Sequence, residues 1–258
     1  MKISIITATL DCVARIGDCL DSVAGQSHTD REHIIIDGAS TDGTLAVLEG
    51  RRDRLAVLVS EPDGGIYEAL NKGLARATGE VVGFLHADDV YGDAEVLASI
   101  AAAFRDPKVM AVYGDLDYLR RLNPVRVVRH WRAGEFDPAA LRWGWMPPHP
   151  TLYLRRSVFQ RLGEMASPGT NVGALGGRGE NAGLGGFDTR YHIAADYDLI
   201  LRVLRQMKGR VVYLPQVLVR MRTGGASNRT LYKIMRKSWE DYLVLSRNGF
   251  GGPVGLGA

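Results

Sequence analysis

The sequence predicts an α/β fold with a mostly parallel central sheet and helices on both faces. Short runs of β-branched residues alternate with segments of helical periodicity over residues 1–104, as expected for βαβ units. Acidic residues follow successive strand candidates, and the 258-residue chain can bury one sizeable core. The composition, 46% hydrophobic and 24% charged, is that of an ordinary globular protein. We therefore expect one α/β domain.

The expected elements follow in order along the chain. Strands are predicted at 2–7, 32–37, 55–60 and 81–86. Helices are predicted through 16–23 and 66–77, and residues 37–49 are predicted to form a turn that leads into a helix. A helix to Phe104 and a strand over 109–115 come next. Mixed or antiparallel pairing is expected over 118–131, turn prolines, a strand and a short helix over 146–159, and a helix from near Asp196.

Two later segments differ in composition from the predicted α/β domain. Residues 164–186 are glycine-rich and aperiodic, which indicates a flexible surface insertion or a mobile lid within one domain. The domain is expected to cover 1–230, followed by an amphipathic helix and flexible tail over 231–258. The apolar face of that helix would carry Leu231, Ile234, Met235, Trp239, Tyr242 and Leu243. Docking onto the domain is its first explanation, and lying on a membrane its second.

Charge and cysteine content narrow the class of protein. The net charge is only +3, from 32 basic and 29 acidic residues, which argues against a nucleic-acid binder. Basic residues cluster in the middle of the chain and near its end. The simpler explanation is two solvated faces, and the alternative is attraction to an anionic membrane surface or to a phosphorylated acceptor. Cys12 and Cys19 are predicted to be free thiols, and no segment is long and apolar enough to span a bilayer. We expect a cytoplasmic protein, with peripheral contact to the inner face of the membrane as an additional expectation.

Acidic side chains follow three neighbouring strand candidates. Asp37 ends the second strand, Asp63 follows the third, and Asp88 and Asp89 follow the fourth. Each alone could be a turn former or a helix cap. The carboxyl ends of parallel strands meet at one edge of a sheet, so the four carboxylates would repel unless they share a cation or hydroxyl and N–H groups. Two aspartates holding Mg²⁺ or Mn²⁺, with a diphosphate completing the coordination, would resolve this repulsion.

The sequence lacks the usual motifs of dinucleotide-binding and P-loop proteins. The segment after the first strand, TATLDCVAR, has no G-x-G-x-x-G, and no G-x-x-x-x-G-K-[ST] occurs in the chain. A nucleotidyltransferase would share the sheet and paired aspartates, but its basic glycine-rich loop is represented only by Arg15.

Six motifs occur together and in order. They are SIITATLD, IIIDGASTDGT, EPDGGIYEALNKGLARATGEVVGFLHADD, MPPHPTLYLRR, AADYDLILR and RMRTGGASN. In this combination the chain resembles the family 2 glycosyltransferases with the GT-A fold, in particular the bacterial branch that builds polysaccharides and glycolipids. The likeness runs to about Asn228.

The resemblance implies roles for residues on the donor side. Thr7 and Asp37 would hold the nucleoside, with Asp63 nearby. Asp88 would contact the ribose or donor sugar, and Asp89 would bind the metal that grips the diphosphate.

Further roles fall on the second half of the chain. Asp196 matches the family's catalytic base. Trp145 and His149 would lie near the acceptor or donor sugar, and Ser227 belongs to a late motif placed near the leaving diphosphate.

The chain also departs from the family's pattern. Asp11 stands where asparagine is frequent, at a position that contacts the nucleoside, and Ala195 stands where many members have glutamate. The glycine-rich stretch lengthens the connection before Asp196.

Asp196 has a structural alternative. A carboxylate at the start of a helix is often only a cap, and the helix dipole would lower its pKa. Burial and other carboxylates would raise that pKa and make Asp196 a better base. Asp198 is expected instead to form a surface pair with Arg202.

The resemblance therefore implies an inverting, metal-dependent transferase that moves a hexosyl or related group. The donor would be a nucleotide sugar, and the acceptor a hydroxyl of a glycan or lipid-linked molecule. A sugar-nucleotide-binding protein without catalysis and a nucleotidyltransferase are the alternatives.

Overall fold

A computed structural model describes residues 1–120, 123–164, 185–207, 209–223 and 231–249, without the side chains of 123–125 and 231–237. Its strands are β1 (Ile3–Thr9), β2 (Arg31–Asp37), β3 (Val57–Ser60), β4 (Val81–Phe84), β5 (Val90–Tyr91), β6 (Val109–Arg120), β7 (Asn123–Trp131), β8 (Tyr153–Arg155) and β9 (Arg210–Arg222). Its α-helices are α1 (Ile16–Ala24), α2 (Thr44–Glu49), α3 (Ile66–Leu74), α4 (Val96–Ala103), α5 (Arg156–Glu164), α6 (Ala195–Arg205) and α7 (Leu231–Arg247). Short 3₁₀ helices lie at Arg52–Arg54, Pro138–Trp143 and His149–Thr151.

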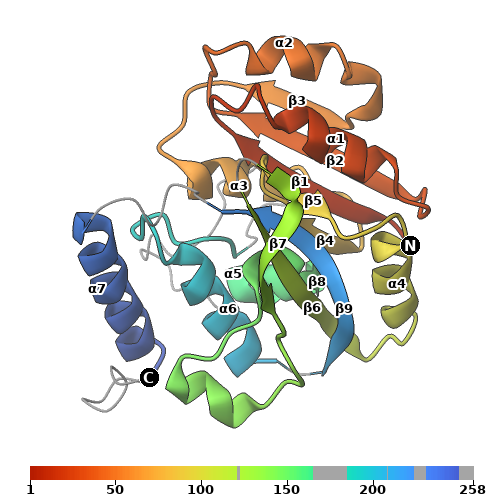
Figure 1. Cartoon of the computed structure of the whole chain (residues 1–258). Coiled ribbons are helices and arrows are strands. Elements are labelled where there is room, and N and C mark those ends of the chain that lie inside the picture. Colours follow the sequence, from red (N-terminus) through yellow and green to blue (C-terminus); the bar gives the residue numbers. More distant parts are fainter. Residues whose placement is uncertain (121–122, 165–184, 208, 224–230, 250–258) are drawn as a thin grey trace.

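The strands form one nine-stranded sheet in the order β3-β2-β1-β4-β8-β6-β9-β5, with β7 paired to β6 (Figure 1). Strands β1 to β4 are parallel where they pair, and so are β6 and β9. Since β8 runs antiparallel to both β4 and β6, these two groups share one direction. The predicted mostly parallel sheet is confirmed, and the carboxyl ends of both groups lie at the same edge.

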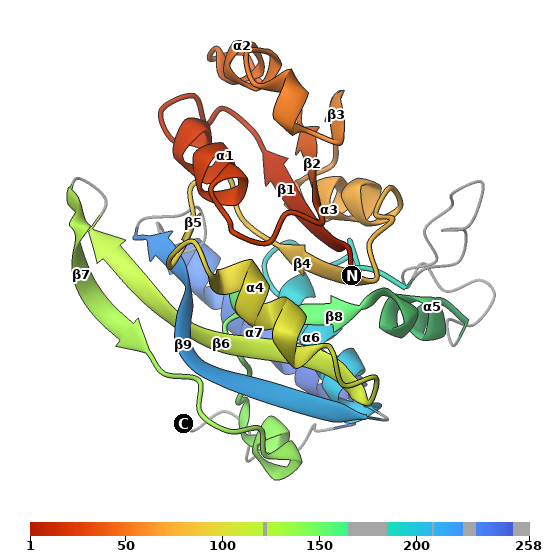
Figure 2. The ribbon, with the colours of Figure 1, turned by 90° about the vertical axis from the view of Figure 1, so that its right-hand side faces the viewer.

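The second half of the sheet differs from the sequence-based expectation. Strands β6 and β7 form an antiparallel hairpin, which confirms the expected antiparallel pairing. However, β6 continues five residues past the predicted end at Asp115, and β9 was not predicted. Figure 2 shows the hairpin and β9 as long ribbons that extend well beyond the short β4 and β8. Pro215 and the arginines of β9 obscure its alternating pattern, and it forms through its long pairing with β6.

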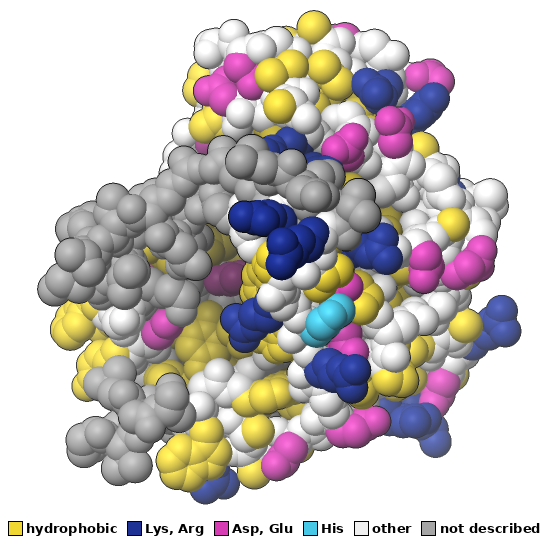
Figure 3. Space-filling view, viewed as in Figure 1, with side chains coloured by type: hydrophobic (Ala, Val, Ile, Leu, Met, Phe, Trp, Pro, Cys, Tyr) yellow, Lys and Arg dark blue, Asp and Glu magenta, His cyan; other side chains and the backbone are white. Residues whose placement is uncertain are grey.

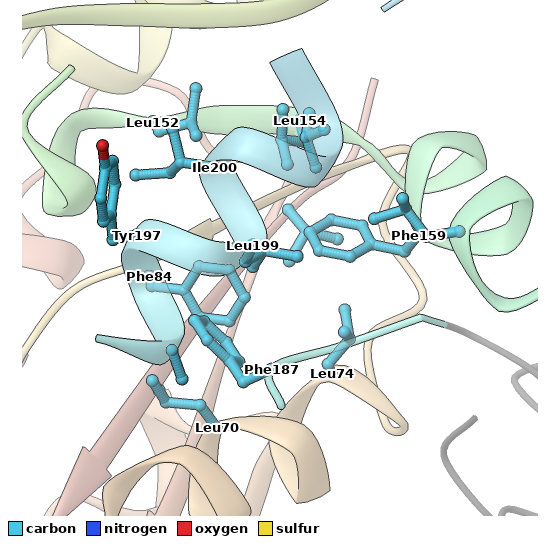
Figure 4. Close-up of a cluster of buried hydrophobic side chains, with 14 of the residues drawn as sticks. Leu70, Leu74, Phe84, Leu152, Leu154, Phe159, Phe187, Tyr197, Leu199 and Ile200 are labelled. Carbon is cyan, nitrogen blue, oxygen red and sulfur yellow. The ribbon is translucent and has the colours of Figure 1, made fainter. Parts of the chain in front are cut away.

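Helices cover both faces of the sheet, as predicted. Apolar side chains of α1 and α4 belong to one buried cluster, and those of α3, α5, α6 and α7 belong to the cluster on the opposite face. In this second cluster Leu199 and Ile200 of α6 lie among Phe84, Phe187 and Leu152 (Figure 4). Both faces are therefore covered, and strands β1, β2 and β4 are accordingly buried at almost every residue.

Helix α7 docks on the domain, which confirms the first of its two explanations. Val244 and Leu245 are buried in the cluster that contains α6, and α7 lies beside α6 in Figure 1. The predicted apolar face is partly wrong, because Trp239 is 61% exposed and Tyr242 is 37% exposed. The docked side instead carries a buried polar pair, Glu240 and Asn248, which the apolar pattern alone could not indicate.

Three smaller expectations can be compared with the structure. Cys12 and Cys19 are free thiols, as predicted. Within the described ranges, no helix has the length and apolarity needed to cross a membrane. The Asp198–Arg202 pair forms at 2.7 Å, but it is not the expected surface contact because Asp198 is buried and its Oδ1 also accepts a hydrogen bond from Asn248.

Candidate active site

Asp37 lies at the carboxyl edge of the sheet as the last residue of β2. It is fully buried and pairs in register with Thr9, the last residue of β1. Its carboxylate accepts hydrogen bonds from the backbone N–H and hydroxyl of Ser40 and from the hydroxyl of Ser60 at 2.6 Å. Asp37 therefore joins the loop after β2 to the end of β3, and its role at a nucleoside stays a prediction.

Asp63 reaches the same edge from the loop after β3. Its Oδ1 accepts a hydrogen bond from the backbone N–H of Gly65 at 2.8 Å, which fixes the turn into α3. A Cβ at Gly38 would lie 3.0 Å from Asp63 Oδ2, so this carboxylate lies against the backbone next to Asp37. Leu10, 61% exposed, borders the same point. The predicted neighbourhood of Asp37 and Asp63 is thus formed, with an apolar surface beside it.

Asp11 connects two loops at this edge. Its Oδ1 accepts a hydrogen bond from the backbone N–H of Thr41 at 2.8 Å, and its own N–H donates to Ser40 Oγ at 2.9 Å. The backbone is left-handed at Asp11, with φ of 47°, a conformation that aspartate and asparagine tolerate better than most residues. An aspartate in place of asparagine suits a contact that only requires an acceptor.

The structure places Thr7 differently from the expectation. Its hydroxyl is fully buried, donates to the Leu85 carbonyl at 2.7 Å and lies 3.0 Å from His33 Nε2. Because both partners are protein atoms, this hydroxyl stabilises the core and is not directed at a nucleoside. Thr9, two residues closer to the carboxyl end of β1, has a buried Oγ1 without a partner among the described residues. Sequence reasoning missed Thr9, although its place at the strand end could have identified it.

Asp88 and Asp89 follow β4 in a turn. Asp89 is fully buried, its Oδ1 accepts a hydrogen bond from the Arg222 backbone N–H at 3.4 Å, and its Oδ2 has no partner within the described part of the chain. The Arg222 guanidinium donates to the Asp88 carbonyl at 3.2 Å and to the Asp18 carboxylate of α1. Burial, reinforced by the charge of Asp88, raises the pKa of Asp89 well above its usual range.

A divalent cation fits the unpartnered oxygen of Asp89. Positive charge there would relieve the cost of an ionised carboxylate in a buried position. In the described ranges no three His, Cys, Asp or Glu side chains gather into a metal site. The chain therefore offers a few carboxylate oxygens rather than a full cage, which is how Mg²⁺ and Mn²⁺ are held when a diphosphate supplies other ligands. The metal role of Asp89 stays a proposal.

Asp196 comes to this region from α6. It is the second residue of that helix, and the N-cap position belongs to Ala194, so Asp196 is not the cap. Its Oδ1 accepts hydrogen bonds from the backbone N–H of Tyr197 at 2.9 Å and from the Tyr67 hydroxyl at 3.2 Å. Burial raises the pKa of Asp196, and these two hydrogen bonds partly oppose that rise. No hydrogen bond to Oδ2 is found among the described residues, which leaves this oxygen for a substrate hydroxyl.

Tyr67 was not predicted as a site residue. Its hydroxyl donates to the Ile193 carbonyl at 2.6 Å and, more weakly, to Asp196, because one proton serves both acceptors. Burial, followed by the charge of Asp196, raises the pKa of Tyr67 well above its usual range, so the phenol keeps its proton. The helix α3 that carries Tyr67 lies close to β1, since a Cβ at Gly73 would come within 2.3 Å of Ile6.

Two histidine rings lie next to each other, and one of them is near two of the carboxylates. The ring of His86 is near enough to Asp88 and Asp196 for both charges to act on it, and its centroid is 5.6 Å from that of His149. Burial, with a smaller effect of His149, lowers the pKa of His86 to about 4, and burial lowers that of His149 to about 4. Both rings are thus neutral near pH 7. His149 Nε2 is buried without a partner among the described residues, which supports its predicted place near a sugar.

The remaining predicted residues contribute less. Trp145 is half-buried between Tyr113 and Phe136, and its indole N–H donates to the Ala133 carbonyl at 3.3 Å. It is thus a packing residue in this structure, and its sugar contact stays a prediction. Ser227 lies outside the described residues, as does most of the stretch 164–186.

Comparison with known proteins identifies the family. Residues 4–163, more than half of the chain, match the family described as "Glycosyl transferase family 2". The chain belongs to glycosyl transferase family 2. A PGL/p-HBAD biosynthesis glycosyltransferase of Mycobacterium tuberculosis is 31% identical over 204 residues, which are 77% of this chain and 68% of that protein. An uncharacterized glycosyltransferase of the same species is 30% identical over 203 residues, 78% of this chain and 68% of that one.

Solved structures share the fold of this family 2 glycosyltransferase. S. aureus TarS in complex with UDP-GlcNAc has a TM-score of 0.68 at 19% identity and covers 96% of this chain and 65% of its own. The mannosyltransferase PcManGT of Pyrobaculum calidifontis in complex with GDP-Man and Mn²⁺ has a TM-score of 0.63 at 21% identity and covers 97% and 64%. The chain thus spans just under two thirds of each of those structures. The family, the GT-A fold and the enzyme class predicted from the sequence are confirmed.

Proposed function

We propose that this chain transfers a sugar from a nucleotide-diphosphate donor to a hydroxyl of a glycan or lipid-linked acceptor, with inversion and with a divalent cation. The observation that carries the proposal is that Asp196 from α6 and Asp88 from the turn after β4 are both near enough to the His86 ring for their charges to act on it. Nucleotide sugars bound in TarS and PcManGT support the donor class.

The donor would lie along the carboxyl edge of the sheet. Beside the end of β2 lie the apolar side chain of Leu10, the carboxylate of Asp63 and the hydroxyl of Thr9, which has no partner among the described residues. This combination suits a nucleoside. Asp88, from the turn after β4, would contact the ribose or donor sugar. A divalent cation at Asp89, when bound, supplies positive charge against the negative charge that develops on the departing diphosphate.

Asp196 would act as the general base. The acceptor hydroxyl loses its proton to Asp196 as its oxygen forms a bond to the anomeric carbon, on the face opposite the nucleotide. The bond from that carbon to the diphosphate oxygen breaks, and its electron pair leaves with the diphosphate. A single displacement inverts the anomeric centre. Burial helps because it raises the pKa of Asp196 and so makes the carboxylate a stronger base.

The acceptor side would lie toward the β6–β7 hairpin. Arg126, Arg129 and Arg132 are exposed on or just after β7, and the Arg129 guanidinium lies 5.4 Å from the centre of the Tyr118 ring. Figure 3 shows Lys and Arg side chains gathered over this hairpin. This charge supports a phosphorylated or lipid-linked acceptor and peripheral contact with an anionic membrane surface, both of which stay predictions.

The test first identifies the donor and then measures the effect of replacing Asp196. Thermal-shift measurements with UDP-, GDP- and dTDP-sugars and Mn²⁺ select the donor, since binding to the folded state raises its apparent stability. We then expect Asp196→Asn to bind that donor within about twofold of wild type while turnover falls by about 10² or more, the scale for losing a general base. Nucleotide release, with water as acceptor where no sugar acceptor is known, measures turnover.

Asp198→Asn is the matched control. Asp198 lies in the same helix turn but binds Arg202 and Asn248, so its loss should lower stability and leave turnover near wild type. Normal turnover of Asp196→Asn would exclude Asp196 as the base. Donor binding without any nucleotide release by the wild-type protein would favour a binding protein that lacks catalysis.

A further inference from the structure

The C-terminal helix places a buried carboxylate against the backbone that leads into α6. Glu240 of α7 is 5% exposed. Its Oε2 accepts hydrogen bonds from the backbone N–H groups of Ile193 at 2.8 Å, Ala194 at 3.0 Å and His192 at 3.1 Å. One carboxylate thus binds three consecutive N–H groups, 46 to 48 residues away in the sequence.

This contact holds the backbone at the start of α6. Of its three N–H groups, that of Ala194 belongs to the N-cap residue, and those of His192 and Ile193 directly precede the helix. The first N–H groups of a helix have no partner within the helix, and a polar N-cap side chain usually accepts one of them. Here the N-cap is Ala194, which cannot do so. A carboxylate at this end also interacts favourably with the helix dipole, and hydrogen bonds to an ionised acceptor are stronger than neutral ones. Glu240 therefore anchors the N-terminal end of α6 from outside the helix.

The anchored backbone is the part that presents Asp196. Ile193 is held at both of its backbone polar groups, because Glu240 accepts from its N–H and Tyr67 donates to its carbonyl at 2.6 Å. Asp196 follows three residues later, and the same Tyr67 hydroxyl reaches its Oδ1. The direction of the Asp196 carboxylate is thus set by one residue of α3 and one of α7.

We propose that Glu240 is a positioning residue for Asp196 and that α7 is part of the active site, an inference that rests on the proposed role of Asp196 as base. The family match ends at residue 163, and nothing in it assigns a function to α7. Glutamine in place of Glu240 would keep one amide oxygen as an acceptor but lose the charge and add an NH2 donor. The three N–H groups would then be held more weakly, and the turn at 192–194 would relax. The expected consequence is a loss of turnover without a matching loss of donor binding.

Three variants test this proposal. In Glu240→Gln we expect kcat for nucleotide release, measured with UDP-GlcNAc or GDP-mannose, to fall at least tenfold while the donor KM stays within twofold. Hydrogen exchange of the amides of residues 192–194 should become faster. Val244→Ala, which removes two buried methyl groups from the same helix, is the control: it should lower the melting temperature and leave kcat near wild type.

The outcomes separate the possible failures. Wild-type kcat in folded Glu240→Gln, or an equal loss in Val244→Ala, would overturn the positioning role. If Glu240→Gln does not fold, Glu240→Asp replaces it, because the shorter side chain withdraws the carboxylate from all three N–H groups. The same fall in kcat is expected for Glu240→Asp. Wild-type kcat in that variant would overturn the proposal. Full activity of Asp196→Asn would instead refute the proposed base, whatever Glu240 does.

Discussion

The donor half of the site and the base half are built in different ways. In the donor half, Asp37 ends β2 and Asp63 follows β3, and their hydrogen-bond partners lie in the loops after these strands or at the end of β3. In the base half, Asp196 depends on Tyr67, 129 residues earlier, and Asp89 on Arg222, 133 residues later. The donor half is thus a local product of βαβ units, whereas the base half exists only in the complete fold.

This difference has a mechanistic meaning. Strand ends in a parallel sheet place carboxylates at one edge whatever the rest of the chain does, so they are suited to a donor shared by many enzymes. The base must be aligned with one acceptor hydroxyl to within fractions of an ångström, which requires support from several elements. Variants of the donor half should therefore change binding, and variants of the base half should change turnover.

The largest effect is expected at Asp89, in the base half. Asp89→Asn should lower nucleotide release by about 10² or more, because a metal contributes several kcal/mol to the stabilisation of charge in the transition state. Its melting temperature should not fall. Since the folded state raises the pKa of Asp89, the ionised side chain costs stability as pH rises from the ordinary aspartate pKa toward the raised one, and asparagine removes that cost.

Thermal denaturation with and without Mn²⁺ and assays with EDTA provide the measurement. Mn²⁺ should stabilise the wild-type protein and not Asp89→Asn. Asp53→Asn, an exposed aspartate before β3 at the opposite edge of the sheet, is the control and should match wild type in both assays. Activity that persists in EDTA would remove the cation from the proposal.

An intermediate effect is expected at Tyr67, within the base half. Because burial raises the pKa of Asp196, kcat should rise with pH through a value above the ordinary aspartate pKa of about 3.9, as the base loses its proton. Tyr67→Phe removes a hydrogen bond to the ionised carboxylate of Asp196, so the rise of kcat with pH should move to higher pH by up to about one unit. A hydrogen bond of about 1 kcal/mol corresponds to just under one pKa unit. We also expect kcat on the plateau to fall about three- to tenfold.

Tyr213→Phe is the matched control for Tyr67→Phe. Tyr213 of β9 also donates to an aspartate, Asp115 of β6, at 2.7 Å. The pH dependence of nucleotide release should be unchanged in this variant. An unshifted acid limb in Tyr67→Phe would mean that Tyr67 serves Ile193 alone and does not tune the base.

The same contrast explains how much could be predicted from the sequence. The four parallel strands of the first half, the acidic residues at their ends and the start of α6 near Asp196 all follow from local patterns. Strand β9 was missed because a proline and arginines interrupt its alternation, and its pairing with β6 spans about a hundred residues. Tyr67 looked like an ordinary residue in the first turn of α3, and Glu240 like a solvated charge on an amphipathic helix.

The difference between the expected and the observed surroundings of Thr7 has another cause. Thr7 and Thr9 lie on the same face of β1, and the sequence shows that both are polar residues in an apolar strand. It does not show that His33 and Leu85 provide partners for Thr7 and not for Thr9. Which of two equivalent hydroxyls is left for a ligand depends on the neighbouring strands.

The smallest effect on activity separates these two threonines and tests the donor half. Thr9→Val should raise the donor KM about fivefold, the equivalent of one hydrogen bond of about 1 kcal/mol, and should leave stability unchanged because the lost hydroxyl has no partner in the described structure. Thr7→Val should leave KM unchanged and cost about 1–3 kcal/mol of stability, since it deprives His33 Nε2 and the Leu85 carbonyl of a buried partner. Donor titration of initial rates and urea unfolding measure the two effects. The reverse pattern would assign the nucleoside contact to Thr7 instead of Thr9.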